Sequence, residues 1–208
     1  MTSLFDFDTA FEKNLVDYRN DVKPRIIRIS SKIKFENKLK REGVEKLITE
    51  LPSRGESLHI VSNGSFDYFT IIPQIINLSG NAVDEFYFTT WTMSRENVTQ
   101  IIDLYDRGVF KKVTALTGEY FRTRESKVWS LLSDSLEARK QRVFSSKNHS
   151  KVTLLKIGGE HYIIEGSANF TANPRIEQFI LSNSEELFNF HKEWLEEILA
   201  KNKVGYGI

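Results

Sequence analysis

The chain has 208 residues and a mass of 24.1 kDa, which is enough for one domain with a sizeable core. Its 40% hydrophobic and 27% charged residues exclude a disordered chain, and no apolar run approaches the roughly 20 residues of a membrane-spanning helix. The absence of cysteine excludes disulfides and thiolate nucleophiles. The start, MTSLFDFDTA, has no signal-peptide pattern, so we expect a cytoplasmic protein.

The net charge is only +1, but it is unevenly distributed. Residues 107–156 contain twelve Lys and Arg against four Asp and Glu. Such an excess is typical of a basic surface that binds an anionic polymer. Solvated helix faces explain it equally well, and both interpretations stay open.

Residues 1–52 read as an amino-terminal extension, mostly helical, that precedes a main domain at 53–208. A capping box at Thr9 and Glu12 predicts a helix that ends before Pro24. Residues 25–33 alternate loosely, as in a strand, and residues 36–51 have a helical pattern. No chemistry can be assigned to this extension.

From Ser57 onward strands alternate with helices. We expect strands at 58–62, 83–90, 110–116, 142–145 and 176–181, with helices ending near Leu78, following Ser94, and at 123–138 and 184–199. Strands joined through helices imply a largely parallel sheet covered on both faces. Sites in such sheets lie beyond the carboxyl ends of the parallel strands.

Three loops follow these predicted strands. They are Asn63-Gly64-Ser65, Thr89-Thr90-Trp91 and Gly118-Glu119-Tyr120, from which we take Ser65, Trp91 and Glu119 as candidates for lining the cleft. Each also has an ordinary structural explanation as a turn residue, a tryptophan at the edge of the core or a helix approach.

Residues 149–177 hold the strongest functional pattern. Two β-rich runs, 151–157 and 160–165, flank Gly158-Gly159 and predict a hairpin. His149 and Lys151 are two residues apart, so in a strand they share a face. The second strand returns a small-residue loop, Gly166-Ser167-Ala168-Asn169, to their neighbourhood, and these residue types together suit a phosphate.

His149-Ser150-Lys151 followed by Gly166-Ser167-Ala168-Asn169-Phe170-Thr171 resembles the paired motifs of the phospholipase D superfamily, in their nuclease-type form. The resemblance implies an α/β fold with a mixed, mainly parallel sheet flanked by helices on both faces. It also implies that Glu177 is the carboxylate that orients the histidine. The sequence departs from the family at Lys156, where the family has an aspartate.

The resemblance further implies a metal-independent phosphodiesterase that needs no cofactor. His149 attacks phosphorus to give a phosphohistidine, while Lys151, Ser167, Asn169 and the backbone at Gly166 hold the phosphate. Because the chain has one copy of the motif, we expect a homodimer with a shared site. The expected substrate is DNA or RNA. Phe170, next to the motif, either stacks on a base of that substrate or packs in the core.

Two other functions remain open. A catalytically weak or inactive dimer that binds nucleic acid or protein would explain Lys156 and the single motif. Hydrolysis of a lipid headgroup is less favoured, because the sequence shows no amphipathic membrane helix. His59, His161 and His191 lack metal-ligand spacing and are expected to be structural.

Overall fold

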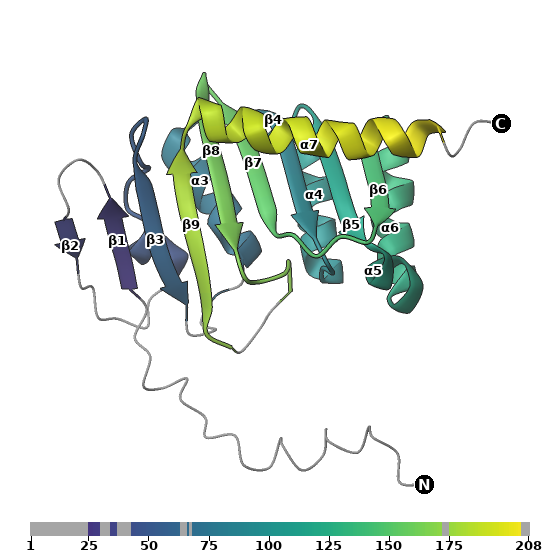
Figure 1. The fold of residues 1–208 in the computed structure, drawn as a ribbon, viewed down its shortest axis with the longest axis horizontal. Coiled ribbons are helices and arrows are strands. Elements are labelled where there is room, and N and C mark those ends of the chain that lie inside the picture. Colours follow the sequence, from purple (N-terminus) through teal and green to yellow (C-terminus); the bar gives the residue numbers. More distant parts are fainter. Residues whose placement is uncertain are drawn as a thin grey trace, which may run out of the picture.

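The computed structural model describes residues 25–29, 34–36, 43–62, 66, 68–171 and 175–204, and only the backbone of 25–29, 34–36 and 202–204. The described strands form one nine-stranded sheet in the order β2-β1-β3-β9-β8-β7-β4-β5-β6 (Figure 1). The strands are β1 (Arg25–Ile29), β2 (Lys34–Glu36), β3 (Ser57–Ser62), β4 (Val83–Thr90), β5 (Val113–Gly118), β6 (Arg142–Ser146), β7 (Val152–Ile157), β8 (Glu160–Gly166) and β9 (Glu177–Asn183). The helices are α2 (Val44–Leu47), the 3-10 turn η3 (Tyr68–Thr70), α3 (Ile71–Ser79), α4 (Arg95–Asp106), α5 (Glu119–Arg124), α6 (Ser126–Ala138) and α7 (Glu185–Val204).

The sheet is mixed, as predicted, but the expectation that it is mainly parallel is wrong. Among the described strands only β4–β5 and β5–β6 pair in parallel, and the other six neighbouring pairs are antiparallel. The β7–β8 hairpin and β9 lie between β3 and β4. Four successive antiparallel pairings leave β3 running in the same direction as β4 (Figure 1), so β3, β4, β5 and β6 all end at one edge of the sheet.

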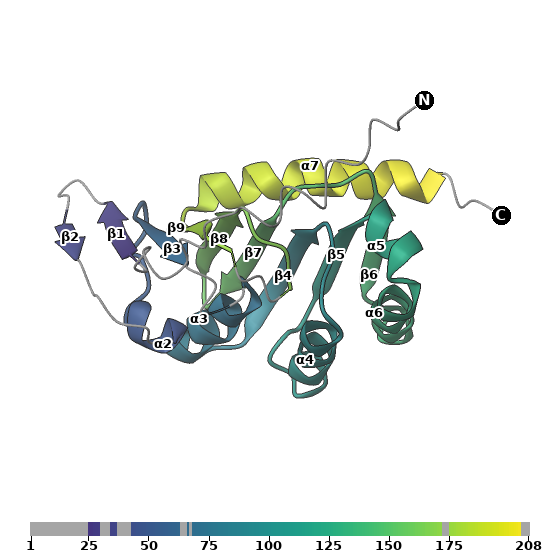
Figure 2. The same ribbon diagram turned by 90° about the horizontal axis from the view of Figure 1, so that it is seen from below.

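Helices cover both faces, which confirms that part of the prediction. Figure 2 shows α3, α4 and α6 on one face and the long helix α7 crossing the other. Within the described part of the chain, no helix combines the length and apolar character that a bilayer crossing requires.

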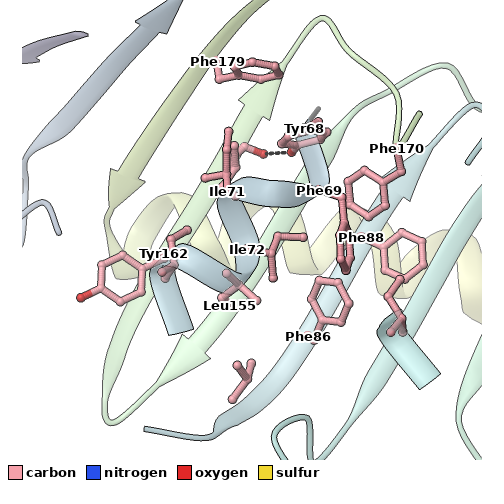
Figure 3. Close-up of a cluster of buried hydrophobic side chains, with 14 of the residues drawn as sticks. Tyr68, Phe69, Ile71, Ile72, Phe86, Phe88, Leu155, Tyr162, Phe170 and Phe179 are labelled. Atoms are coloured by element: carbon pink, nitrogen blue, oxygen red, sulfur yellow. Dashed lines mark hydrogen bonds between the residues drawn. The ribbon is translucent and has the colours of Figure 1, made fainter. Parts of the chain in front are cut away.

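The larger core lies under α3, α4 and α6. It is rich in aromatic rings. Phe86 stacks on Phe110 with centroids 4.5 Å apart. Tyr68 stacks on Phe179 at 5.3 Å (Figure 3). The Tyr68 hydroxyl is fully buried and donates to the carbonyl of Ile164 at 2.8 Å, which satisfies its polar group. This core fixes the spacing of β4, β8 and β9, whose ends carry the candidate site.

A polar cluster attaches α7 to the opposite face. Arg142 on β6 makes a two-pronged ion pair with Glu196 on α7, with N–O distances of 2.6 and 2.7 Å. The Tyr87 hydroxyl donates to the same carboxylate at 2.8 Å. The bonds from Arg142 are the largest influence on Glu196 and lower its pKa to about 2. The helix is therefore tied to strands β4 and β6 by charge as well as by apolar packing.

Most element boundaries agree with the sequence prediction to within two or three residues. There are two exceptions. The helix expected over 123–138 is two helices, α5 and α6, that meet at Glu125. Helix α7 begins where expected, with Ser184 Oγ accepting from the Leu187 N–H, but it continues to Val204 and not to 199. Pro73 lies in the first turn of α3, where its missing N–H costs nothing.

The described parts of the extension are less helical than expected. Strand β1 falls within the predicted strand and pairs antiparallel with β3. The helix expected over 36–51 is wrong at its start, because Glu36 ends strand β2, and α2 has four residues. The helix expected before Pro24 lies outside the described residues, and the division of the chain at residue 52 stays a prediction.

The Arg142–Glu196 pair predicts an acid-dependent stability. At pH 7 we expect Glu196→Gln to lower the free energy of unfolding by about 1 kcal/mol, a value suited to a partly exposed ion pair. Because the folded pKa of Glu196, about 2, lies below its ordinary value of 4.5, the stabilisation is complete above about pH 5 and is lost as the pH falls toward 2.

Urea unfolding of wild type and variant at pH 7, 4 and 2.5 measures this difference. Glu197→Gln, at the exposed neighbouring position, is the matched control and should leave stability nearly unchanged. A gap between wild type and Glu196→Gln that stays constant from pH 7 to 2.5 would contradict the role given to Glu196.

Candidate active site

The candidate residues gather at the edge where β3, β4, β5, β6 and β8 end and β7 and β9 begin (Figure 1). Three strand registers bring them there: Ser62 pairs with Glu177, Thr90 with Thr117, and Val152 with Glu165. Residues far apart in the sequence therefore meet in one set of loops.

His149 and Lys151 are in direct contact. The ammonium Nζ of Lys151 lies 3.0 Å from Nδ1 and 3.5 Å from Nε2 of the His149 ring, and it donates to the His149 carbonyl at 2.6 Å. Lys151 is buried and His149 is exposed. Burial lowers the pKa of Lys151, an effect that the Glu177 carboxylate opposes. The pair offers an accessible imidazole beside a partly desolvated cation.

Hydrogen bonds hold the loop that carries this pair. The Asn148 side chain donates to the Thr90 carbonyl at 3.3 Å and accepts from the Ser150 hydroxyl at 2.6 Å. Ser150 Oγ also lies 2.9 Å from Thr89 Oγ1, and the same Thr89 oxygen accepts from the Val152 N–H. The Thr89 side chain and the Thr90 carbonyl of β4 therefore hold the loop on both sides of His149. The sequence did not indicate this role for Asn148, Ser150 or Thr89.

The small-residue loop adjoins Lys151 on the other side. The Gly166 N–H donates to the Lys151 carbonyl at 3.3 Å. The next residue, Ser167, is exposed and makes a short hydrogen bond from its hydroxyl to Glu177. Ser167 Oγ also accepts from the Gln178 N–H at 3.2 Å. The hydroxyl and the carboxylate thus form a fixed polar pair at the start of β9.

Gly166 has a steric reason to be glycine. A Cβ at this position would lie 2.5 Å from Cδ1 of the buried Phe179 ring and 2.8 Å from the Gln178 carbonyl oxygen. Real contacts of this kind are not shorter than about 3 Å. The close approach of β8 to β9, which sets the position of Ser167, therefore excludes any side chain.

Asn169 links this loop to the end of β4. Its side-chain oxygen accepts from the backbone N–H of Trp91 at 3.2 Å. The Trp91 indole in turn lies 5.7 Å from the His149 ring, centroid to centroid. Both halves of the motif thus contact Trp91, one of the cleft residues predicted from sequence.

Phe170 is a core residue, which rules out the alternative that it stacks on a base. Its ring is fully buried and stacks on Phe88 with centroids 5.1 Å apart (Figure 3). Its backbone is equally engaged, since the carbonyl accepts from the Ser94 N–H at 2.8 Å and from the Asn97 side chain at 3.0 Å. Phe170 anchors the loop that ends in Asn169.

Of the remaining residues predicted from the sequence, the structure describes Glu119 but not Ser65. Glu119 is exposed in the first turn of α5 and lines a hollow of about 460 Å³ with Arg122 and Trp129. Its neighbour Tyr120, which was not chosen from the sequence, stacks on Trp91. The register of Thr90 with Thr117 brings these two loops together, and the sequence alone could not supply that register. Ser65 lies outside the described residues.

Lys156 does not belong to this edge of the sheet. It is the fifth residue of β7 and pairs with His161 close to the β7–β8 turn. It lies five positions along the chain from Lys151, which in a strand is a distance of roughly 16 Å. The departure from the family motif at this position therefore leaves the contacts of His149 intact.

The basic excess of residues 107–156 is largely balanced by acids from elsewhere. Five of its members form ion pairs with acidic residues outside that range: Arg107 with Asp103, Lys111 with Asp84, Lys112 with Glu85, Arg139 with Asp106 and Arg142 with Glu196. Four others are exposed on α5, at the start of α6 and before β7, namely Arg122, Arg124, Lys127 and Lys147. The positive surface at the site edge is thus smaller than the count suggests.

Two other histidines have structural surroundings. His191 is buried, accepts from the Trp194 indole at 3.0 Å and lies 3.2 Å from the Glu165 carboxylate. His161 packs edge-on against Phe188. In the described part of the chain, His, Asp and Glu side chains form no group of three that could hold a metal ion.

No protein-family model and no curated protein matches the sequence. Among solved structures, Nuc from Salmonella typhimurium, a phospholipase D family member, is similar at 15% identity and a TM-score of 0.47, over 61% of this chain and 85% of that one. TrmBL2, an archaeal chromatin protein, is similar at 13% identity and a TM-score of 0.43, over 80% of this chain and 56% of that one. At TM-scores below 0.5, neither likeness establishes the family or the function of this chain.

The contact between Gly166 and Phe179 gives a sharp test of the site's construction. We expect Gly166→Ala to lower the free energy of unfolding by about 1–3 kcal/mol, because the added methyl overlaps the Phe179 ring and the Gln178 carbonyl. Thermal unfolding followed by circular dichroism measures it. Gly43→Ala, where nothing lies within 4 Å of the added Cβ, is the matched control, and equal melting temperatures for the two variants would contradict the close approach.

Proposed function

We propose that this chain is a metal-independent phosphodiesterase, a nuclease that cleaves DNA or RNA. The observation that carries the proposal is the contact of the exposed His149 ring with the buried Lys151 ammonium, next to the Ser167–Glu177 pair. Phosphodiester cleavage needs a nucleophile, cationic stabilisation of the non-bridging oxygens and a proton for the leaving oxygen. In this proposal His149 and Lys151 of one chain supply the first two. The proposal includes a cytoplasmic location.

The reaction proceeds in two displacements. A phosphate oxygen replaces the imidazole as the acceptor of the Lys151 ammonium, which frees a ring nitrogen of His149 to attack phosphorus. The bond from phosphorus to the leaving oxygen breaks, and a phosphohistidine forms. Water then attacks phosphorus, breaks the N–P bond and releases a phosphate monoester, which restores His149. Ser167 and Asn169 hold the phosphate, and Glu177 acts on the imidazole as its orienting carboxylate.

The leaving oxygen needs a proton that the attacking histidine cannot supply in the same step. A second protonated His149 from a partner subunit meets this need and later removes the proton from the attacking water. The proposal therefore includes an isologous homodimer whose two His149 side chains share one site.

Binding without turnover is the second candidate function. It is favoured by the position of Lys151, whose ammonium contacts both nitrogens of His149 and its carbonyl. If a phosphate does not displace it, the imidazole lone pair stays engaged. The chain would then be a dimer that holds nucleic acid or a protein.

The first experiment is cleavage of labelled single- and double-stranded DNA and RNA in excess EDTA. We expect cleavage by the wild type, and a loss of at least about 10³-fold in rate for His149→Ala, because the variant has no nucleophile. Lys156→Ala is the matched control: it also removes one side chain from the 149–177 region, but one remote from the site, and it should retain activity.

Three outcomes separate the candidates. Cleavage that disappears in EDTA contradicts the metal-independent mechanism. Binding of nucleic acid by the wild type with no cleavage favours the second candidate. Release of headgroup from phospholipid vesicles, with none from any oligonucleotide, would make the lipid the substrate instead.

The dimer is tested separately by light scattering across micromolar concentrations. We expect a mass twice the 24.1 kDa of one chain, unchanged in His149→Ala because that ring is exposed and supports no core contact. A monomeric mass at every concentration, in a preparation that cleaves nucleic acid, would refute the shared site and require a proton donor from within the chain.

A further inference from the structure

Two aromatic side chains form a stack at the mouth of the candidate site. Trp91 follows β4 and Tyr120 lies in the first turn of α5, and their ring centroids are 4.3 Å apart at an interplanar angle of 19°. Because the two rings are nearly parallel, they form a stack whose outer face is flat. The larger aromatic clusters of the protein lie in the core, whereas 43% of Tyr120 is exposed.

We propose that this pair is a stacking platform for an unpaired nucleobase, which makes single-stranded nucleic acid the preferred ligand. The inference rests on the proposed function for its ligand class and adds strandedness to it. Aromatic rings bind bases through their π-faces with little regard to sequence. A base in a duplex has both faces covered by its neighbours, so an outer ring reaches it only where the strand is unpaired.

Trp91, one of the two rings of the platform, is held in place by its neighbours. The backbone N–H of Trp91 donates to the side-chain oxygen of Asn169 at 3.2 Å. The indole packs closely against Gly118, where a Cβ would be 2.7 Å from Trp91 Cδ1. Beside it, the Thr92 hydroxyl donates to Glu125 at 2.7 Å and ties the loop to the α5–α6 junction. Little ordering of the protein is left for the ligand to drive.

Trp91 lies close to the nucleophile. Its ring centroid is 5.7 Å from that of His149, so the nucleotide next to a phosphate on His149 and Lys151 lies near the platform. Stacking there orients the scissile phosphate toward the imidazole.

The charges around the platform suit a continuing strand. Arg124 is four residues after Tyr120 in α5 and therefore lies on the same helix face, and Lys147 is exposed on the loop before His149. Glu119 and Glu125 are acidic residues in the same region. Arg124 and Lys147 are thus the cations available to the adjoining phosphates.

The test uses the full chain with His149→Ala, so that the ligand stays intact. Binding of a fluorescein-labelled single-stranded DNA 12-mer is compared with binding of the same sequence as a duplex. We expect tighter binding of the single strand, and a loss of about tenfold or more for it on Tyr120→Ala, with duplex affinity nearly unchanged. Tyr120→Phe keeps the ring and should keep the affinity.

Phe190→Ala is the matched control, because Phe190 is also an exposed aromatic, 61% exposed, but lies on α7. It should change neither affinity. Removing one base at a time from the 12-mer should reveal one position whose loss costs as much as Tyr120→Ala. Tyr120→Ala and removal of that base, combined, should lower the affinity no more than either change alone, as expected when the two groups contact each other.

Failures of this inference and of the proposed function can be told apart. Equal affinity of Tyr120→Ala and its parent for single strands overturns the platform, even in a protein whose wild type cleaves nucleic acid. Tyr120-dependent binding of single strands with no cleavage by the wild type supports the platform and overturns the nuclease. Preference for the duplex, or no binding of either form, overturns the platform.

Discussion

The antiparallel pairing of β7 with β4 is the constraint on which the site depends. β4 has a parallel neighbour, β5, on one side and the antiparallel β7 on the other. At one edge of the sheet, the end of β4 therefore meets both the end of β5 and the beginning of β7. His149 and Lys151 precede β7, Trp91 follows β4, and Tyr120 follows β5. With β7 in the opposite direction, the histidine would lie at the far edge, away from the aromatic pair and from Glu177.

The local parts of this arrangement could be predicted from the sequence. Gly158-Gly159 and the two β-rich runs define the hairpin, and the Ser94 cap and the apolar spacing of Val98 and Ile101 define α4, because these signals involve residues close in the chain. The order of strands could not be predicted in this way. The rule that helix-linked strands are parallel neighbours holds for β4 to β6, but it fails for β3, since β9 and the hairpin occupy the positions between β3 and β4.

In the candidate site, too, the parts that are local in sequence could be predicted and the parts that depend on strand pairing could not. His149, Lys151 and the loop from Gly166 to Asn169 form a motif within 21 residues of chain, and the hairpin alone brings them together. Tyr120 and Thr89 have no such local signal, because their roles depend on the registers of β5 and β7 against β4. Phe170 shows the opposite case, in which a residue next to the motif is directed inward by the same loop that presents Asn169.

The pairing of β3 with β9 has a consequence for how the chain is synthesised and folds. Ser57 on β3 is paired with Ser182 on β9, 125 residues later, so the middle of the sheet closes only when nearly the whole chain is available. Contacts of such long range slow folding, because the loop must close before the contact stabilises it. A nascent or truncated chain that ends before Glu177 leaves β8 and β3 as open edges with exposed N–H and C=O groups, which are templates for aggregation. Strand β9, which carries the carboxylate of the site, therefore also protects the edges of β3 and β8 against aggregation.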